Sequence, residues 1–288
     1  MHYLGRFFHS KKKLAFDGLY NSDEALVYPI ESIFYPNKTG SPYNFNELHP
    51  ILFNKPSKII GVGKNYKSHI KEFDSKIPSE PIIFLKSPSA IIGPSDKILL
   101  PKNIKGNIEY EGEVAIVIKK ETEKISEKNA PDYILGYTCA NDVTARELQK
   151  QDGQWTRAKG FKTFCPLGPW ILPYEEFPRF QNLSLKTYVN NKLVQSTKTS
   201  SMLFNIPYLI SFISQVMTLN PGDIILTGTP SGVGQLKANY KVEVEIEQIG
   251  SLVNSVTNES MLTKNQLPQA KSKIVYKSKK SKNLIRKK

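Results

Sequence analysis

Four acidic side chains stand where two apolar stretches of this chain begin or end. Glu109, Glu111 and Glu113 lead into the apolar residues that follow them, and Asp142 directly follows another apolar run. Because side chains at i and i+2 of a strand share a face, Glu111 and Glu113 point the same way. These acids could be the solvated face of an edge strand, with Asp142 as a helix cap. Alternatively, they are buried around a hard divalent cation such as Mg²⁺ or Mn²⁺, which prefers oxygen ligands.

Short strands and few helices must position these acids. Asp142 is predicted at a strand-to-helix corner, because Thr144 and Glu147 have the spacing of a capping box that opens a helix. A core helix is predicted over 201–218, where apolar residues recur at i, i+3, i+4 and i+7, and a shorter helical segment over 66–73. The other predicted strands are 3–8, 14–20, 25–30, 58–63, 81–86, 224–227 and 241–247.

The predicted fold class is β-rich α+β. The 288 residues suit one large domain with a small appendage. Turn residues at 54–57 separate a small N-terminal β domain, residues 1–56, from a main domain over 57–257. Residues 258–288 lose the apolar rhythm and become rich in Lys, Ser, Asn and Gln, so we expect a basic, disordered tail there.

The positive charge of the chain is concentrated near its end. The formal net charge is +14, and ten Lys or Arg residues follow Glu259 with no further acid. A binding protein that acts through this tail on nucleic acid or an anionic membrane is therefore a remote alternative. Tyr276 is the only aromatic residue available there for stacking on bases, so nucleic acid is not an expected partner.

The N-terminal residues lack the apolar core of a secretory signal, and no apolar stretch reaches membrane-spanning length. We expect a cytoplasmic protein without a membrane partner; organellar targeting is a weaker alternative, because no acid precedes Asp17. The two cysteines form no C-x-x-C pair, so a disulfide or zinc site is not expected. The glycine segments 61–66 and 228–234 lack nucleotide-binding fingerprints and are better interpreted as loops around a small ligand.

Several segments resemble, in order and spacing, the motifs of the fumarylacetoacetate hydrolase family. Residues 63–72 resemble its G-x-N-Y-x-x-H-x-x-E segment, 109–114 its D/E-Y-E-G-E-L strand and 141–146 its N-D-V-T-A-R motif. The further matching segments are 155–161, 165–170 and 227–234. The resemblance covers roughly residues 57–250 and implies a mixed β-roll catalytic domain with few helices, in a homodimer. One departure is Lys162, where many members carry Asp.

The resemblance implies that Glu111, Glu113 and Asp142 ligate Mg²⁺ or Mn²⁺, with Glu109 behind the ligands. It also implies that His69 and Glu72 form the base that activates water. At i, i+3 on a helix these two share a face, where a carboxylate would fix the imidazole tautomer. From spacing alone, such a pair is usually an exposed surface pair.

Further polar side chains are implied to face the metal and the substrate. Lys159 is expected to be catalytic, in the oxyanion environment. The implied substrate-binding residues are Lys86, Arg146, Gln149 and Thr229. On the residues alone, Lys86 and Arg146 could equally be ordinary surface charges.

The predicted function is metal-dependent hydrolysis of a C–C bond in a 2,4-dioxo acid of the acylpyruvate or fumarylacetoacetate type. In this hypothesis, a water activated by His69 and Glu72 attacks the distal carbonyl, and the bond breaks toward an enolate. The same enolate supports an alternative, namely an isomerase, tautomerase or decarboxylase of a 2-oxo diacid, such as a hydroxymuconate-type isomerase or an oxaloacetate tautomerase.

Overall fold

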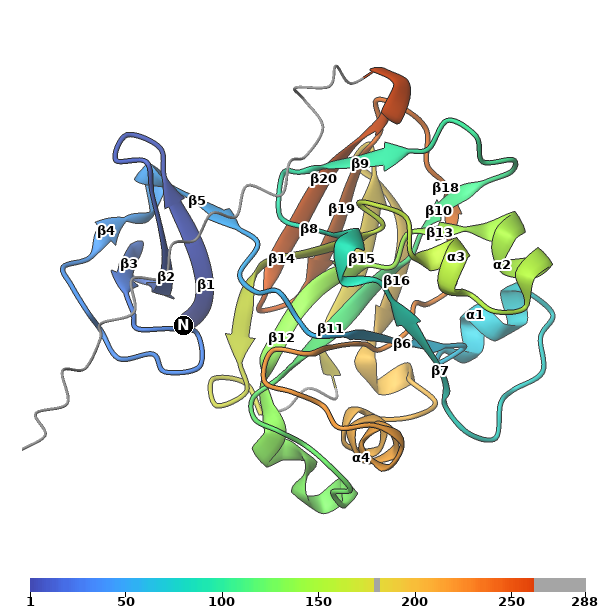
Figure 1. Ribbon diagram of the computed structural model, residues 1–288, viewed down its shortest axis with the longest axis horizontal. Helices are drawn as coiled ribbons and strands as arrows, with labels where there is room; N and C mark the ends of the chain where they lie inside the picture. The colour runs from blue at the N-terminus through green and yellow to red at the C-terminus, as the bar shows by residue number, and fades with distance from the viewer. Residues whose placement is uncertain (179–181, 262–288) are drawn as a thin grey trace, which may run out of the picture.

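The computed structural model describes residues 1–178 and 182–261, and its fold is the predicted β-rich α+β type (Figure 1). In these residues the largest sheet has 12 strands, with ten in the path β4-β3-β2-β1-β14-β12-β11-β17-β6-β7; β5 pairs with β1 and β8 with β14. Their bounds are β1 (His2–His9), β2 (Leu14–Asn21), β3 (Leu26–Pro29), β4 (Tyr43–Asn44), β5 (Leu48–Ile51), β6 (Ile59–Gly63), β7 (Ile82–Lys86), β8 (Ile91–Ile92), β11 (Gly112–Ile118), β12 (Ile134–Asn141), β14 (Cys165–Pro173) and β17 (Ile224–Leu226).

Two smaller sheets and four α-helices complete the described part of the chain. The three-stranded sheet has the order β13-β10-β18, and the five-stranded sheet the order β16-β15-β19-β20-β9. Their bounds are β9 (Lys97–Leu100), β10 (Ile108–Tyr110), β13 (Thr144–Ala145), β15 (Ser184–Val189), β16 (Lys192–Lys198), β18 (Gly234–Gln235), β19 (Lys241–Ile246) and β20 (Gly250–Asn258). The α-helices are α1 (Lys67–Glu72), α2 (Arg146–Asp152), α3 (Thr156–Lys159) and α4 (Ile206–Val216). Short 3₁₀ helices span Phe45–Glu47, Pro88–Ala90, Glu127–Tyr133, Thr199–Ser201 and Glu259–Met261.

The N-terminal strands β1 to β5 form a region at one side of the molecule (Figure 1). They extend the large sheet, because β1 pairs antiparallel with β14 and places Leu4 opposite Ile171. The strands predicted over 3–8, 14–20 and 25–30 are confirmed as β1, β2 and β3. The predicted tail lies mostly outside the described residues, which end at 261.

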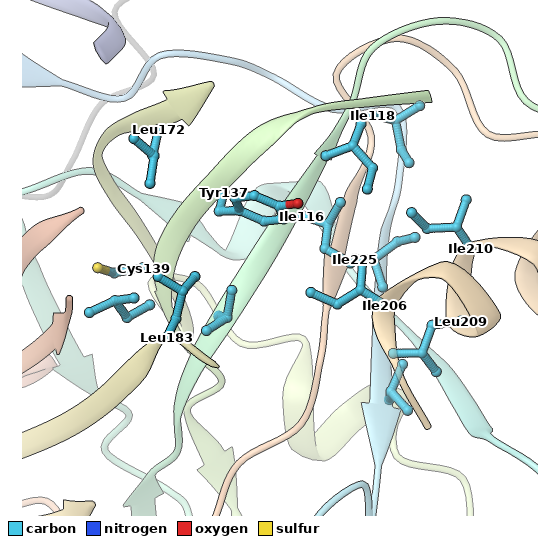
Figure 2. Packing of buried hydrophobic residues seen from close by; sticks show 14 of the residues in the cluster. Ile116, Ile118, Tyr137, Cys139, Leu172, Leu183, Ile206, Leu209, Ile210 and Ile225 are labelled. Carbon is cyan, nitrogen blue, oxygen red and sulfur yellow. The ribbon is translucent and has the colours of Figure 1, made fainter. Parts of the chain in front are cut away.

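The centre of the large sheet is fully buried. Every residue of β11 and of β12 is buried, and β11 lies between β12 and β17. Helix α4 covers this region: Figure 2 shows its Leu209 and Ile210 in the same apolar cluster as Ile116 of β11 and Ile225 of β17. The acids at the start of β11 and the end of β12 are therefore held by two fully buried strands.

The predicted helix 201–218 is confirmed but is shorter, because Asn205 caps it: the Asn205 side chain accepts a hydrogen bond from the Tyr208 amide at 2.8 Å. The capping box at Thr144 and Glu147 is wrong. Residue 144 belongs to β13 and its hydroxyl donates to the Asp142 carbonyl at 2.8 Å, while the Glu147 carboxylate accepts from the Asn107 amide. Pairing of β13 with β10 thus competes with the helix cap for the backbone of Thr144.

Candidate active site

The predicted cluster of acids is buried inside the protein. Glu111 is 4% exposed, Glu113 2% and Asp142 0%, and ligand atoms of the three carboxylates all lie within 4.8 Å of one another. The solvated edge-strand interpretation is wrong, because β11 is an interior strand with partners on both sides. Three buried carboxylates this close together require compensating positive charge.

The pairing of β11 with β12 brings the acids together. In this antiparallel register Gly112 lies opposite Asn141, so the residues next to this pair, Glu111 and Asp142, are neighbours. Two hydrogen bonds fix them: the Glu111 amide donates to the Asn141 side chain at 2.9 Å, and the Asp142 amide donates to the Glu111 carbonyl at 2.8 Å. The site is thus held by backbone geometry as well as by side-chain contacts.

Two buried lysines supply part of the compensating charge. The Lys159 Nζ lies 2.8 Å from Glu111 Oε2 and 2.5 Å from Asp142 Oδ2. The Lys86 Nζ lies 2.5 Å from Asp142 Oδ1, and its side chain has no exposed surface. Both carboxylates raise the pKa of Lys159 above its usual value although burial opposes this, so the ammonium stays charged.

Arg146 links the acids to the start of α2. Its guanidinium donates from Nε to Glu109 at 2.7 Å, from Nη2 to Glu111 at 2.5 Å and from Nη1 to the Gln149 side chain at 2.5 Å. The ring of Phe73 lies 5.1 Å below the guanidinium carbon. Lys86 and Arg146 are therefore not surface charges, and Glu109 lies behind Arg146.

The charges divide the three carboxylates into two kinds. Burial disfavours the ionised form of Glu111, but Lys159 and Arg146 outweigh it and hold its pKa well below the usual range. Burial and the like charges of Asp142 and Glu111 raise the pKa of Glu113 well above its usual value. The Glu113 side chain accepts a hydrogen bond from the Gly228 amide at 2.7 Å, and it forms no ion pair with a described residue.

These residues fit a divalent metal ion. A cation among the carboxylates would lie next to Glu113, the one member of the three that has no ion pair with a described residue. The donor set is all oxygen and drawn from carboxylates, which suits Mg²⁺ or Mn²⁺ rather than zinc.

His69 and Glu72 form a hydrogen-bonded pair at the end of α1. The His69 Nδ1 lies 3.1 Å from Glu72 Oε2, and the other oxygen of Glu72 accepts from the Gly232 amide at 2.9 Å. The His69 side chain is only 11% exposed, so this is not an exposed surface pair. Burial lowers the pKa of His69, although the negative charges of Glu111 and Glu72 oppose the shift.

The acids and His69 line one cavity of about 260 Å³. The other predicted residues that line it are Arg146, Gln149, Lys159 and Thr229. Lys86 and Glu72 are not lining residues but hold Asp142 and His69, respectively, from behind. Every residue predicted for the site is thus in it or in contact with it, whereas Lys162 is exposed and not among the lining residues.

Aromatic side chains that were not predicted for the site also line this cavity. Phe84 and Trp155 pack with ring centroids 5.2 Å apart, and Lys159 Nζ lies 5.0 Å from the centre of the Phe84 ring. Trp155 begins the matching segment 155–161, and Phe84 lies in the predicted strand 81–86 two positions before Lys86. Lys64 and Lys150 also line the cavity and were missed.

Gln195 is a further residue of the site that no sequence motif predicted. Its buried side chain donates to Thr229 Oγ1 at 2.9 Å and to the Pro230 carbonyl at 3.0 Å, and it accepts from the Gly112 amide at 3.0 Å. Thr229 in turn donates to the Gly112 carbonyl at 2.9 Å. Gln195 lies on β16 and connects the loop that contains Thr229 to Gly112, the residue between Glu111 and Glu113.

Comparisons with known proteins place this site in a family. The model of the fumarylacetoacetate hydrolase C-terminal domain matches residues 58–257. A mitochondrial oxaloacetate tautomerase from Xenopus laevis is 43% identical over 222 residues, which are 74% of this chain and 69% of that protein. In the described residues no helix has the length and apolar character needed to cross a membrane.

Two solved structures are similar over nearly the whole of their chains. A 5-carboxymethyl-2-hydroxymuconate delta-isomerase from Mycobacterium smegmatis is 40% identical with a TM-score of 0.80, covering 90% of this chain and 99% of that chain. A fumarylacetoacetate hydrolase from Exiguobacterium antarcticum is 32% identical with a TM-score of 0.80, covering 90% and 100%. The names of the similar proteins therefore include a tautomerase, an isomerase and a hydrolase.

Proposed function

The chain belongs to the fumarylacetoacetate hydrolase family of enzymes, and on that premise we propose that it enolises a 2-oxo acid without breaking a C–C bond. The reaction is a keto–enol tautomerisation or a double-bond isomerisation. The observation that carries this proposal is the agreement of names among similar proteins: a tautomerase at 43% identity and an isomerase at 40%. They favour the non-cleaving alternative over hydrolysis.

The side chains of the site suit proton transfer next to a carbonyl. A divalent ion held by Glu111, Glu113 and Asp142 would supply a Lewis acid for the oxygens of the oxo acid. Glu72 accepts a hydrogen bond from the Nδ1–H group of His69, which leaves Nε2 free to accept a proton. In the proposal, the neutral imidazole removes a proton from the carbon next to the keto group, and the electron pair moves onto the keto oxygen.

The buried cations stabilise the negative charge that develops on that oxygen. The ammonium of Lys159 is held by Glu111 and Asp142 and moves little during the reaction. The Phe84 ring lies 5.0 Å from the Lys159 ammonium nitrogen, and an apolar neighbour of this kind strengthens electrostatic interactions. Return of the proton to the oxygen gives the enol, and return to a different carbon of a conjugated chain gives the isomer. No water is consumed and no bond between carbons breaks.

Hydrolysis of a 2,4-dioxo acid is the second candidate, and a specific contact favours it. The His69–Glu72 pair is built as a general base, which is also what the activation of water needs. The similar structure from Exiguobacterium antarcticum bears the name of a hydrolase. The two candidates share their first step and differ in whether a nucleophilic water follows it.

One experiment separates the two candidates. The protein with Mg²⁺ is mixed with the enol form of oxaloacetate and, separately, with acetylpyruvate. Loss of the enol absorbance faster than without enzyme, with no pyruvate formed, supports the tautomerase. Release of pyruvate and acetate from acetylpyruvate at a comparable or greater rate contradicts it and supports the hydrolase. The His69→Ala variant is the control for catalysis by this site.

A further inference from the structure

Tyr110 stands between two acids, Glu109 and Glu111, but its side chain does not line the cavity. It is 5% exposed and belongs, with Ile108, to a buried apolar cluster. Side chains at i and i+2 of a strand share a face, so Tyr110 and Ile108 point away from Glu109. The ring is thus fixed by packing, which leaves its hydroxyl as the one polar group that it can offer to a neighbour.

The hydroxyl of Tyr110 holds the loop that completes the site. It donates to the Gly232 carbonyl at 3.0 Å, and a Cβ at Gly234 would lie 2.8 Å from it. The backbone of Tyr110 also pairs with Gly234, where β10 meets β18. Figure 1 shows these two strands on the same side of the molecule as α1. Tyr110 therefore holds the loop through both its backbone and its side chain.

The same loop binds the acid that lies behind the proposed base. The Gly232 amide donates to Glu72 Oε1 at 2.9 Å, and Glu72 Oε2 lies 3.1 Å from His69 Nδ1. A second contact joins the loop to α1, because the Ser231 amide donates to the Ser68 hydroxyl at 3.3 Å. The Glu72 side chain is 29% exposed, so water competes for its carboxylate whenever the amide is displaced.

We propose that Tyr110 is a positioning residue for the base. Through Gly232, it holds Glu72 where the carboxylate fixes the tautomer of His69. This proposal rests on the proposed function, in which His69 removes the proton. Tyr110 does not line the cavity, so it acts on the base and not on the substrate. The segment that carries the acids thereby also sets the position of the base.

Tyr110→Phe tests the proposal, because it removes the hydroxyl and keeps the ring. With Mg²⁺ present, kcat should fall about threefold to tenfold, the usual effect of losing one hydrogen bond, while KM and Mg²⁺ affinity stay unchanged. Steady-state kinetics and calorimetry measure these quantities. A wild-type kcat, or a rise in KM without a fall in kcat, would overturn the proposal.

Tyr3→Phe is the matched control. The Tyr3 hydroxyl also donates to a backbone carbonyl, that of Gln248, at 2.9 Å, and Tyr3 is buried but does not line the cavity. Both variants should have similarly lowered melting temperatures, because each loses one such hydrogen bond. Tyr3→Phe should nevertheless keep the wild-type kcat. An equal fall of kcat in both variants would reduce the effect of Tyr110→Phe to general destabilisation and overturn the proposal.

A double-mutant cycle with Glu72→Ala separates positioning from a merely structural role. If Tyr110 acts through Glu72, Tyr110→Phe has no further effect on kcat in the Glu72→Ala background. If the two residues contributed independently, their effects would multiply, and this result would overturn the proposal. The kinetics are measured with whichever acid the protein converts, oxaloacetate enol or acetylpyruvate, because the same pair of residues serves both candidate reactions.

NMR titration of the imidazole groups of the Mg²⁺-loaded protein needs no turnover. The signal that is missing from His69→Ala assigns His69. Burial lowers the pKa of His69, and among the charges that act on it Glu111 and Glu72 raise this pKa whereas Arg146 lowers it. A less firmly held Glu72 raises it less, so the pKa of His69 should be lower in Tyr110→Phe than in the wild type. It should be unchanged in the control variant.

The titration distinguishes failure of this proposal from failure of the proposed function. A lowered pKa of His69 in Tyr110→Phe, in a protein that does not enolise oxaloacetate, would overturn the proposed function and keep the positioning role. An unchanged pKa of His69 in Tyr110→Phe would overturn the positioning role, whatever reaction the protein catalyses.

Discussion

At the scale of single residues, the three acids of the cluster differ although their sequence motifs look alike. Glu111 and Asp142 each form ion pairs with two cationic side chains, whereas Glu113 accepts a hydrogen bond from the backbone amide of Gly228. An ion pair stabilises a buried carboxylate, and an amide compensates only part of the charge. Glu113 is therefore the carboxylate whose ionisation depends most on a bound cation.

Glu113→Gln tests this difference. The neutral amide avoids the cost of burying Glu113 beside two like charges, which is the cost that raises the pKa of Glu113, so the metal-free variant should have a free energy of unfolding about 1 kcal/mol higher than the metal-free wild type at pH 7. Added Mg²⁺ should stabilise the wild type more than the variant, because a ligand has been lost. Thermal unfolding with and without Mg²⁺ measures both effects. Equal stabilisation of the two proteins by Mg²⁺ would argue against a site at Glu113.

The proposed base makes a second prediction at this scale. His69→Ala should lower kcat by about 10² to 10⁴, the usual contribution of a general base, because no other described imidazole lines the cavity. Mg²⁺ affinity should be unchanged, since His69 is not among the three acids. Enol absorbance and calorimetry measure the two quantities. An unchanged kcat would exclude His69 as the base.

The pH dependence follows from the surroundings of His69. Burial lowers its pKa below 6.5 and nearby Arg146 adds to this, whereas Glu111 and Glu72 act in the opposite direction. The base is the neutral imidazole, so activity should be lost as the pH falls through this lowered pKa. The acid limb of kcat/KM should therefore have its midpoint below pH 6.5.

Glu72→Gln removes a negative charge that raises the pKa of His69, and should move this midpoint to still lower pH. A profile of kcat/KM against pH for both proteins is the measurement. A midpoint above 6.5 in the wild type, or an upward shift in the variant, would contradict the assignment of this limb to His69.

At the scale of elements, a loop rather than a strand or helix completes the site. The segment that contains Thr229 and Gly232 has contacts on two sides: Gln195 of β16 holds Thr229, and Glu72 of α1 holds the Gly232 amide. Gly232 itself requires glycine, because its φ is 98° and a Cβ would lie 2.0 Å from the Val194 carbonyl oxygen. The loop thus links the base, the acids and β16 to each other.

Gln195→Ala tests that link. Truncation leaves the Gly112 amide and the Pro230 carbonyl without their buried partner, so the free energy of unfolding should fall by about 2 to 4 kcal/mol. Because Gln195 holds Thr229, which is predicted to bind substrate, KM should rise more than kcat falls. Denaturant unfolding and steady-state kinetics measure these effects. The control, Gln151→Ala on the exposed face of α2, should change neither.

At the scale of the whole molecule, the large sheet joins the N-terminal strands to the strands that carry the site. β14 pairs with β1 on one side and with β12 on the other, so the N-terminal region adjoins the centre of the protein. The homodimer remains a proposal that rests on the family resemblance, and sedimentation of the purified protein would test it.

The basic C-terminal segment gives the prediction at this scale. Deletion of residues 262–288 removes ten basic residues and keeps every described residue that lines the cavity. We expect kcat and KM to be unchanged, and any salt-sensitive binding to nucleic acid or anionic vesicles to be lost. Kinetics and binding assays of the truncated and full-length proteins are the measurements. A large fall in kcat would show that catalysis requires the segment.

The sequence alone determined the features that depend on local spacing. Side chains at i and i+2 of a strand or i and i+3 of a helix have fixed relations, which is why Glu111 with Glu113, and His69 with Glu72, could be paired in advance. Helix α4 and the strand over 241–247, observed as β19, were likewise predicted from periodicity. The capping box at Thr144 failed because a distant strand, β10, pairs with that backbone.

The tertiary structure decided what depends on contacts between distant parts of the chain. Lys86 meets Asp142 across 56 positions and Gln195 meets Gly112 across 83. No local pattern encodes such contacts. Burial is also a property of the packed molecule, and it is burial that excluded the solvated-strand interpretation of the acids. Only the fold shows that the cavity cations Arg146 and Lys159 are paired with buried carboxylates.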